Sequence, residues 1–409
     1  MLKIVLILIT CSFGFCQLNY QISPEFSLES FSIPIELKSK LSEKITLNHQ
    51  SLFFKTNHQF DRYLWHDYKQ NNLVFVSDIS FLEYNDSSFS IKFGRDYLDD
   101  GNQSKIFGLK DAPFSPSLDH LNLYIKNSKY FRLKNRIARL DNRKIKYDNE
   151  ELIFNRWYYL KEMEFNISLS STFSIYEGVI STGVDRGLEW YYLYPLSSYI
   201  MEHKHEISRY DGQDSTYFIG KGDNDNHFTG LSFKLLSTKY KIYSEIFIDE
   251  WQLDKETRDN IQTIFGYLIS ATYTPNDINN FTFEFALASP WLYLNRATFG
   301  TFEKHYQPLG LKDPKSAYYG FLFERNIKSK KLRIMFRKQY KSNQNMLTKW
   351  DAWDNKIEIL QFENSVDLES FIEYKNIEGK FFNSLGIRHN LFGSKNTTFF
   401  VSKDVKFKI

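Results

Sequence analysis

The sequence predicts an all-β protein, a transmembrane antiparallel up-and-down β-barrel of outer-membrane type with about 18 strands. Three observations predict this class. Apolar and polar residues alternate with a period of two almost throughout the chain, strand pairs recur with tight turns on one side and long connections on the other, and an apolar leader indicates export. We expect the long loops to be external and the lumen to be polar and partly plugged.

The composition excludes several other classes of protein. The chain has 409 residues, a mean hydropathy of −0.45 and no apolar run of about 18 residues, so it is not a polytopic helical membrane protein. Lys and Arg (52) nearly balance Asp and Glu (49), and 18% of the residues are aromatic. These values argue against a nucleic-acid binder defined by its charge and against a disordered chain. A spanning sheet remains compatible, because only alternate residues need to be apolar.

The first residues predict a signal peptide over 1–16. Lys3 precedes a compact apolar stretch at 4–9, and polar Gln17 follows the segment. Both cysteines, Cys11 and Cys16, lie inside this leader, so cleavage before Gln17 leaves a mature chain without cysteine. That excludes a disulfide scaffold, a zinc-thiolate site and a cysteine nucleophile. We expect residues 17–30 to form a short N-terminal periplasmic segment and residues 31–409 to form the barrel.

The predicted strands come in hairpins. The clearest hairpin joins 264–273 to 281–287 through turn residues at 274–277. Similar units are predicted near 31–54, 73–95, 119–140, 155–178, 228–250, 317–339, 356–376 (with its turn at Asn364 and Ser365) and 381–408. The connections 96–118, 179–227 and 288–316 are long and rich in Gly, Asp, Asn, Tyr and Pro. Such an asymmetry is typical of outer-membrane barrels.

Charged residues alternate with apolar ones in the predicted strands. An Arg that faces lipid near the midplane costs about 2–4 kcal/mol, so we expect these charges to point into the lumen. There they can pair across strands and narrow or plug the bore. This favours a closed binding barrel over a wide pore, although selective porins also carry charged constrictions. The predicted lumen network comprises Arg132, Arg136, Glu245, Asp249, Glu284, Glu324, Arg333 and Arg337.

Several segments resemble the Wzi-type capsule-assembly proteins. A Gly-Arg-Asp strand end at 94–96 leads through Phe-Gly-Leu-Lys-Asp-Ala-Pro-Phe at 107–114 to a new strand at 121–123. The resemblance continues, in the same order along the chain, at 185–186 with 194–196, at 222–224 with 242–250, and at 309–314. Lys312 and Asp313, together with Asp99 and Asp100, depart from the pattern of the family.

The resemblance implies an outer-membrane barrel of about 18 strands that acts as a lectin for capsular or extracellular polysaccharide. The implied partners are surface polysaccharide, outer-membrane lipid and lipopolysaccharide, and polysaccharide-export machinery, with no nucleic acid. Independently, the long loops carry aromatic faces and planar polar groups, which suit sugars. Each of these side chains could instead be a girdle or loop-packing residue. The glycan-binding candidates are Arg95, Asp111, Phe114, Asp185, Arg186, Trp190, Tyr192, Asp223, Asn224 and Trp291.

No cofactor, metal site or enzymatic activity is predicted. The run 222–227 alternates carboxylate and amide oxygens but lacks the spacing of an EF-hand, and the Glu and His residues at 202–206 have no identifiable third ligand. Nothing resembles a nucleophile elbow, a P-loop or a dinucleotide fingerprint.

Two alternatives to the lectin interpretation remain open. A porin or substrate-specific outer-membrane channel would use the same barrel. A soluble periplasmic sandwich or propeller would share the local alternation, because burying one face of a sheet produces the same pattern. The sequence assigns neither the sugar nor an oligomeric state.

Overall fold

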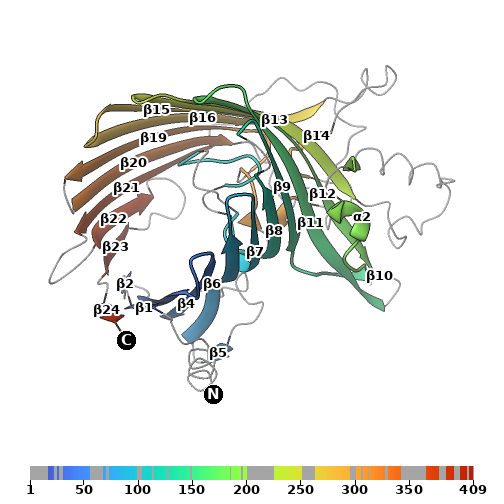
Figure 1. Cartoon of the computed structure of the whole chain (residues 1–409), viewed down its shortest axis with the longest axis horizontal. Helices are drawn as coiled ribbons and strands as arrows, with labels where there is room; N and C mark the ends of the chain where they lie inside the picture. The colour runs from blue at the N-terminus through green and yellow to red at the C-terminus, as the bar shows by residue number, and fades with distance from the viewer. Residues whose placement is uncertain are drawn as a thin grey trace.

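A computed structural model of the chain shows a large, strongly curved antiparallel sheet (Figure 1). The structure describes residues 17–22, 25–26, 31–55, 68–70, 73–98, 104–112, 115–126, 129–147, 150–184, 186–194, 197–199, 225–250, 263–294, 301–304, 307–311, 313–327, 330–341, 365–376, 384–390, 397–402 and 405–408. The predicted signal peptide at 1–16 lies outside this part of the chain.

The N-terminal half of the sheet is built from twelve segments. They are β1 (Gln17–Ile22), β2 (Glu25–Phe26), β3 (Phe31–Lys40), β4 (Ile45–Lys55), β5 (Tyr68–Gln70), β6 (Leu73–Asn85), β7 (Phe89–Asp96), β8 (Leu118–Ile125), β9 (Phe131–Arg139), β10 (Arg143–Tyr147), β11 (Glu150–Asn166) and β12 (Ser171–Val184).

The C-terminal half continues the same sheet. Its segments are β13 (Asn226–Leu236), β14 (Tyr240–Glu250), β15 (Ile264–Asn276), β16 (Asn279–Ala288), β19 (Ser316–Ile327), β20 (Lys330–Lys341), β21 (Ser365–Asn376), β22 (Ser384–Asn390), β23 (Thr397–Ser402) and β24 (Val405–Lys408). A separate two-stranded ladder comprises β17 (Glu303–Lys304) and β18 (Gln307–Pro308), and a single short helix is described, α2 (Trp190–Leu193).

The strands form an up-and-down series in which each long strand pairs antiparallel with the next. Of the 22 segments in the described sheet, β2 and β5 are short additions, β10 extends the edge of β9, and β24 follows β23 after two residues, which leaves eighteen long strands. This confirms the predicted strand number. Because β23 pairs with β22 while β24 pairs with β1, the chain itself links the first strand to the last.

The connections differ at the two ends of the strands, as predicted. Tight turns join β3 to β4, β6 to β7, β11 to β12, β13 to β14, and β15 to β16. At the other end the links are long, and they include 97–117, 185–225, 289–315 and 342–364. The long links therefore share one end of the sheet, from which they can reach the interior.

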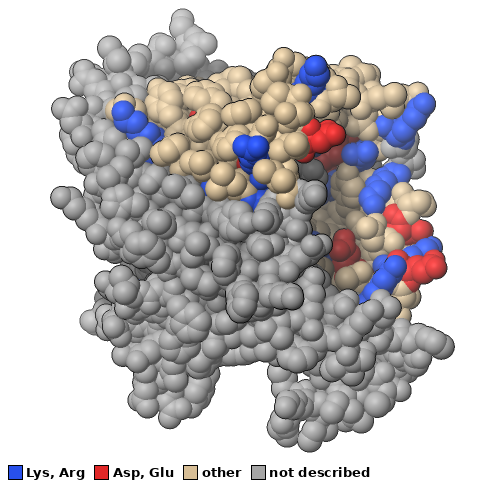
Figure 2. Space-filling model, turned by 90° about the vertical axis from the view of Figure 1, so that its left-hand side faces the viewer, with Lys and Arg blue, Asp and Glu red and all other residues tan. Residues whose placement is uncertain are grey.

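The sheet has an apolar outer face and a polar inner face. Phe283 and Phe321 are opposite each other in register on β16 and β19 and are 51% and 39% exposed. Their neighbour Glu284 is opposite Gly320 on the other face and is 0% exposed. In Figure 2 uncharged residues cover most of the described surface; scattered charged side chains interrupt it, and charges of both signs gather on its right-hand side. This is the architecture of an outer-membrane β-barrel.

Helices contribute little to the described fold. The one described helix, α2, has four residues, and nothing described is helical over a length that could cross a membrane.

Two predicted boundaries were wrong. Strand β1 lies inside the segment 17–30 that was expected to be periplasmic, because Leu18, Tyr20 and Ile22 alternate and pair in register with β3. The hairpin predicted over 356–376 is different as well. Ser365, expected in its turn, begins β21, which pairs with β20 across the long link 342–364. The other half of that predicted hairpin lies outside the described residues.

Candidate functional site

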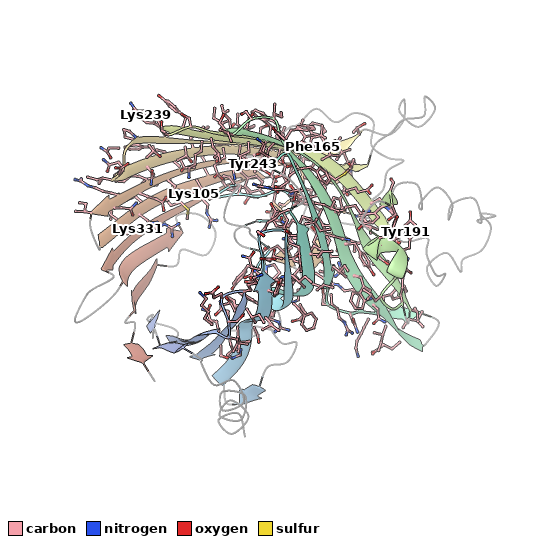
Figure 3. All side chains as sticks on the ribbon, viewed as in Figure 1. Lys105, Phe165, Tyr191, Lys239, Tyr243 and Lys331 are labelled. Atoms are coloured by element: carbon pink, nitrogen blue, oxygen red, sulfur yellow. The ribbon has the colours of Figure 1, made fainter. Side chains whose placement is uncertain are left out.

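The interior of the sheet is filled by the connection between β7 and β8. We call its described residues 104–112 and 115–117 the plug. Ile106, Phe107, Leu109 and Ala112 of the plug are at most 3% exposed. Figure 3 shows Lys105 of the plug inside the space that the curved sheet encloses. This connection therefore folds inward rather than extending away from the barrel.

A second inward connection lies between β16 and β19, and we call its described residues 289–294, 301–304 and 307–311 the counter-plug. The backbone N–H of Ala112 donates to the carbonyl oxygen of Leu309 over 3.0 Å, and the Tyr293 hydroxyl donates to the carbonyl oxygen of Leu109 over 2.9 Å. Lys304 donates to the carbonyl oxygen of Ser117 over 2.7 Å. The two connections thus form one unit inside the bore.

Plug, counter-plug and inner wall share one apolar cluster. Plug residues Leu109 and Ile106 pack in the same cluster as counter-plug and inner-wall side chains. The cluster includes Leu292, Tyr293, Leu294, Phe302, Leu309 and Leu311 of the counter-plug, and Tyr158, Leu160, Tyr176, Phe247, Leu268 and Leu322 of the strands. The interior therefore contains a densely packed apolar region that joins the two connections to the wall.

Two inner-wall glycines make room for the plug. A Cβ atom on Gly320 would lie 2.8 Å from Ile106 and 2.9 Å from Phe107, and one on Gly266 would lie 2.8 Å from Leu109. These distances are shorter than a normal van der Waals contact. The wall is therefore shaped to the side chains of the plug.

Fully buried ion pairs also join the plug to the wall. Arg136 of β9 contacts Asp111 of the plug at 2.6 Å, and Lys110 of the plug contacts Glu162 of β11 at 2.7 Å. All four side chains are at most 2% exposed. Burial alone would lower the pKa of Lys110, but Glu162 and the other nearby carboxylates outweigh it, and the pKa is raised. Lys110 therefore stays charged.

The tip of the plug is held by Glu284 of β16. The Glu284 carboxylate accepts hydrogen bonds from the backbone N–H groups of Lys105 (2.7 Å), Ile106 (3.1 Å) and Phe107 (2.9 Å). It also accepts from the hydroxyls of Ser104 (2.6 Å) and Ser270 (2.9 Å). One buried carboxylate thus organises the backbone of the tip.

A partly hydrated charged surface remains beside the plug. Lys105 forms an ion pair with Glu324 of β19, which also contacts Lys331 at 2.8 Å and Arg333 at 3.4 Å from β20. The three basic side chains are 37%, 34% and 32% exposed, whereas Glu324 is buried. Figure 3 labels Lys105 and Lys331 in this sector. Water therefore reaches the interior here and not at the apolar cluster.

The connection from β12 to β13 packs on the outside of the barrel. We call its described residues 186–194 and 197–199 the strap. Tyr192 and Tyr199 of the strap pack in one cluster with Ile137, Tyr159 and Val179, which face away from the lumen. Rings of Tyr159 and Tyr192 are 4.7 Å apart between centroids. This long connection therefore covers the wall and not the lumen.

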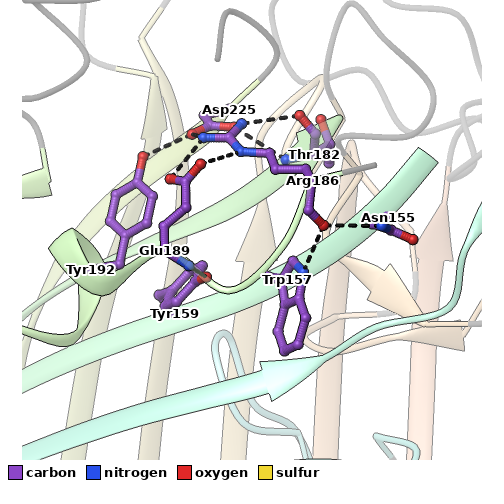
Figure 4. A network of polar contacts seen from close by, with 8 residues as sticks. All are labelled: Asn155, Trp157, Tyr159, Thr182, Arg186, Glu189, Tyr192 and Asp225. Atoms are coloured by element: carbon purple, nitrogen blue, oxygen red, sulfur yellow. Dashed lines mark hydrogen bonds and ion pairs between the residues drawn. The ribbon is translucent and has the colours of Figure 1, made fainter. Parts of the chain in front are cut away.

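Arg186 fixes the strap in place (Figure 4). Its guanidinium donates to Asp225 at 2.9 Å and to both oxygens of Glu189 at 2.7 and 3.0 Å, and the Tyr192 hydroxyl donates to Asp225 at 2.8 Å. The Trp157 indole donates to the Arg186 carbonyl oxygen. Burial alone would lower the pKa of Arg186, but Asp225 and Glu189 outweigh it and the pKa is raised.

Beneath the strap lies a polar row on the outer wall. Asn135, Lys161 and Glu177 are directly opposite one another on β9, β11 and β12. Lys161 donates to the carbonyl oxygen of Ser197, and its ammonium lies 4.2 Å from the ring centroid of Tyr199. Lys161 is only 3% exposed. The strap thus supplies partners for a cation on the outer wall.

The predicted lumen residues lie on the inner side, at different depths. Arg136, Glu245, Asp249, Glu284 and Glu324 are buried. Arg132 and Arg333 are partly exposed, and each contacts a carboxylate, Glu164 and Glu324 respectively. Arg337 is also partly buried, opposite Gly320 in register.

Several glycan-binding candidates form contacts with other residues of the protein. Arg95 pairs with Asp119 at 2.8 Å, while Asp111 and Arg186 form the pairs described above. Tyr192, expected to offer an exposed face, is 1% exposed, and Trp291 packs against the apolar cluster. Both side chains act as packing residues in this structure, and their assignment to glycan binding stays a prediction. Phe114, Asp185, Asp223, Asn224 and the side chain of Trp190 lie outside the described structure.

Sequence reasoning missed Lys110, Glu162, Lys161 and Tyr293 as structural determinants. Glu162 could have been found, because it alternates with the outward residues of β11. Lys161 has the opposite parity and falls on the outer face, where a cation signals a covering segment. Lys110 and Tyr293 lie in irregular connections, where no period exists to place them.

Comparison with known proteins yields likeness in structure alone. No family model matches the chain, and no curated protein matches it. Pseudomonas aeruginosa OccD3 (OpdP) is similar over 97% of this chain and 92% of its own, with 8% identity and a TM-score of 0.48. Acinetobacter baumannii OccAB1 is similar over 96% of both chains, with 9% identity and a TM-score of 0.46. Likenesses this distant assign no function.

Proposed function

We propose that the protein is a narrow, substrate-selective channel of the outer membrane whose bore is closed to free diffusion. The observation that carries this proposal is the plug. Its apolar side chains pack with those of the counter-plug in the interior, while Lys105, Lys331 and Arg333 leave a charged, partly exposed surface beside them. A wide pore would need a continuous polar path across the whole bore.

Selectivity follows from the sizes and charges of these groups. A solute that enters must pass close to side chains of both signs, because the basic groups surround the buried carboxylate of Glu324. Charged constrictions of this kind discriminate by size and charge. Large or uncharged solutes should therefore pass slowly, and small charged solutes should compete with one another.

A second candidate is a lectin-like barrel that binds capsular or extracellular polysaccharide at the cell surface. The ordered motifs that resemble the Wzi-type proteins favour it, and so does the Tyr- and Trp-rich strap, in which Tyr194 is exposed. A plugged bore suits this function as well, since attachment needs no passage. The implied partners would then be surface polysaccharide, lipopolysaccharide and the polysaccharide-export machinery.

Single-channel recording in planar bilayers separates the two candidates. A selective channel should give small unitary currents that a permeant charged solute blocks in a concentration-dependent way. A silent bilayer, together with release of polysaccharide from cells that lack the protein, would instead support the lectin candidate. Large currents that no solute blocks would contradict both.

A further inference from the structure

We propose that Glu284 is the positioning residue that holds the plug in the bore, and that its carboxylate is the latch whose loss frees the tip of the plug. The inference deepens the proposed function. The predicted effect of Glu284 variants on ion current rests on that function, whereas their predicted effect on the position of the plug does not.

Both oxygens of the Glu284 carboxylate are used. Oε1 accepts from the backbone N–H of Lys105 and from the Ser270 hydroxyl, and Oε2 accepts from the Ser104 hydroxyl and from the N–H groups of Ile106 and Phe107. Glu284 is 0% exposed. Hydrogen bonds to an ionised acceptor are short and strong, and burial spares these from competition with water.

The geometry of the tip depends on this carboxylate. Three consecutive N–H groups at 105–107 point to one side chain, which sets the course of the backbone. That course carries Ile106 and Phe107 onto Gly320, the inner-wall position that has no Cβ. Without the carboxylate, these buried N–H groups would lose their acceptor, and unpaired buried donors are strongly disfavoured.

The ion pairs between the plug and the wall differ in kind from the Glu284 contacts. Lys105 with Glu324, Lys110 with Glu162, and Asp111 with Arg136 are pairs between side chains. Long side chains can keep such pairs while the backbone shifts. Glu284 holds the backbone of the plug directly, which is why we assign it the positioning role.

The first experiment measures exposure of the plug. Ala112, buried at 0% exposure, is replaced in the full chain by cysteine as a reporter, with Cys11→Ser and Cys16→Ser to remove the native thiols. A membrane-impermeant maleimide should react slowly with the reporter in the parent. Glu284→Gln should speed the reaction at least tenfold, Glu284→Ala more, and Glu284→Asp less.

Glu164→Gln is the matched control. Glu164 also faces inward, on β11, but it contacts Arg132 and Tyr124 and not the plug. Its replacement should leave the reaction rate unchanged. Heat-modifiable migration on gels should be retained by every variant, which shows that the barrel is folded. If Glu284 were needed only for folding of the barrel, its variants would lose heat-modifiable migration, and any faster maleimide reaction would be seen only in unfolded protein.

Bilayer recording of the same variants tests the consequence for the bore. Glu284→Ala should raise the unitary conductance several-fold over the parent and over Glu164→Gln. A faster maleimide reaction with unchanged current would support the role of Glu284 in holding the plug and would count against the proposed channel function. A reporter that stays as slow in folded Glu284→Gln and Glu284→Ala as in the parent would overturn the inference.

Discussion

At the scale of single residues, the buried charges of the lumen depend on pairing. Arg136 and Asp111, like Lys110 and Glu162, lie at 0–2% exposure in direct contact. A buried pair contributes little relative to apolar residues of the same size, whereas a buried charge that has lost its partner is costly. The pairs therefore tie the plug to the wall chiefly through the penalty for separating them.

We predict that Lys110→Met lowers stability by less than the about 3–5 kcal/mol of a fully broken buried pair, because Lys134 remains 3.9 Å from the buried Glu162 carboxylate. The double variant Lys110→Met with Glu162→Leu should recover part of the loss. Urea unfolding of the refolded barrel, followed by gel migration, measures both. Equal losses in the single and double variants would contradict the pairing argument.

The glycines of the inner wall give a second prediction at this scale. Gly320→Ala should destabilise the plugged state by about 1–3 kcal/mol, because its Cβ overlaps Ile106 and Phe107. Gly187→Ala is the control, since a Cβ there meets nothing within 4 Å. Adding Ile106→Val to Gly320→Ala should restore part of the stability. Thermal gel-shift midpoints compare the four proteins.

The sequence predicted on which face of the sheet many of the charged residues lie. Alternation alone placed Arg136, Glu245 and Glu284 on the polar face, because parity along a strand decides the face. It did not predict that Asp111 would meet Arg136 or that Glu284 would meet residues 104–107. Those contacts join distant parts of the chain through an irregular connection, and no local pattern records them.

At the scale of elements, the strap covers the polar row of the outer wall, which explains why polar side chains can occupy that face. Lys161 is five residues from the end of β11 at Asn166, which places it about 12 Å from the tight turns for a tilted strand. Nearby strands expose Leu231 and Ile246 to the outside. The strap covers the polar row where the neighbouring wall is apolar.

We predict that the strap stabilises the barrel in lipid only because it covers the polar row on the outer wall. Asp225→Asn should loosen the strap by weakening its contact with Arg186, and an uncovered Lys161 would then cost about 2–4 kcal/mol against lipid. In a Lys161→Met, Glu177→Leu background the same change should cost less than half as much. Unfolding of the four variants in lipid vesicles forms a double-mutant cycle. Equal costs in both backgrounds would refute the shielding role.

The elements also show where prediction from sequence ends. The tight turns and the long links were predicted, because turn residues and alternation are local signals. Strand β1 was missed because its six residues lie close behind the predicted leader. The sequence did not show that the plug folds inward while the strap folds outward, since both belong to polar and aromatic connections at the same end of the sheet.

At the scale of the whole molecule, the described part of the chain forms a curved antiparallel sheet of eighteen long strands, and described residues of two long connections lie in its interior. An up-and-down sheet with an apolar outer face has few ways to use its inner face. The inner face can line a water-filled lumen, as in a wide pore, or it can pack against loops of the same chain that fill the lumen. The apolar cluster that joins plug, counter-plug and wall shows the second arrangement.

We propose above that the plug closes the bore to free diffusion. The most direct test compares the unitary conductance of the intact protein with that of a variant in which residues 99–116 are replaced by a short Gly-Ser linker. Both proteins must show the same heat-modifiable migration. We predict a several-fold larger conductance for the variant, whereas equal conductances in the two folded proteins would contradict the account.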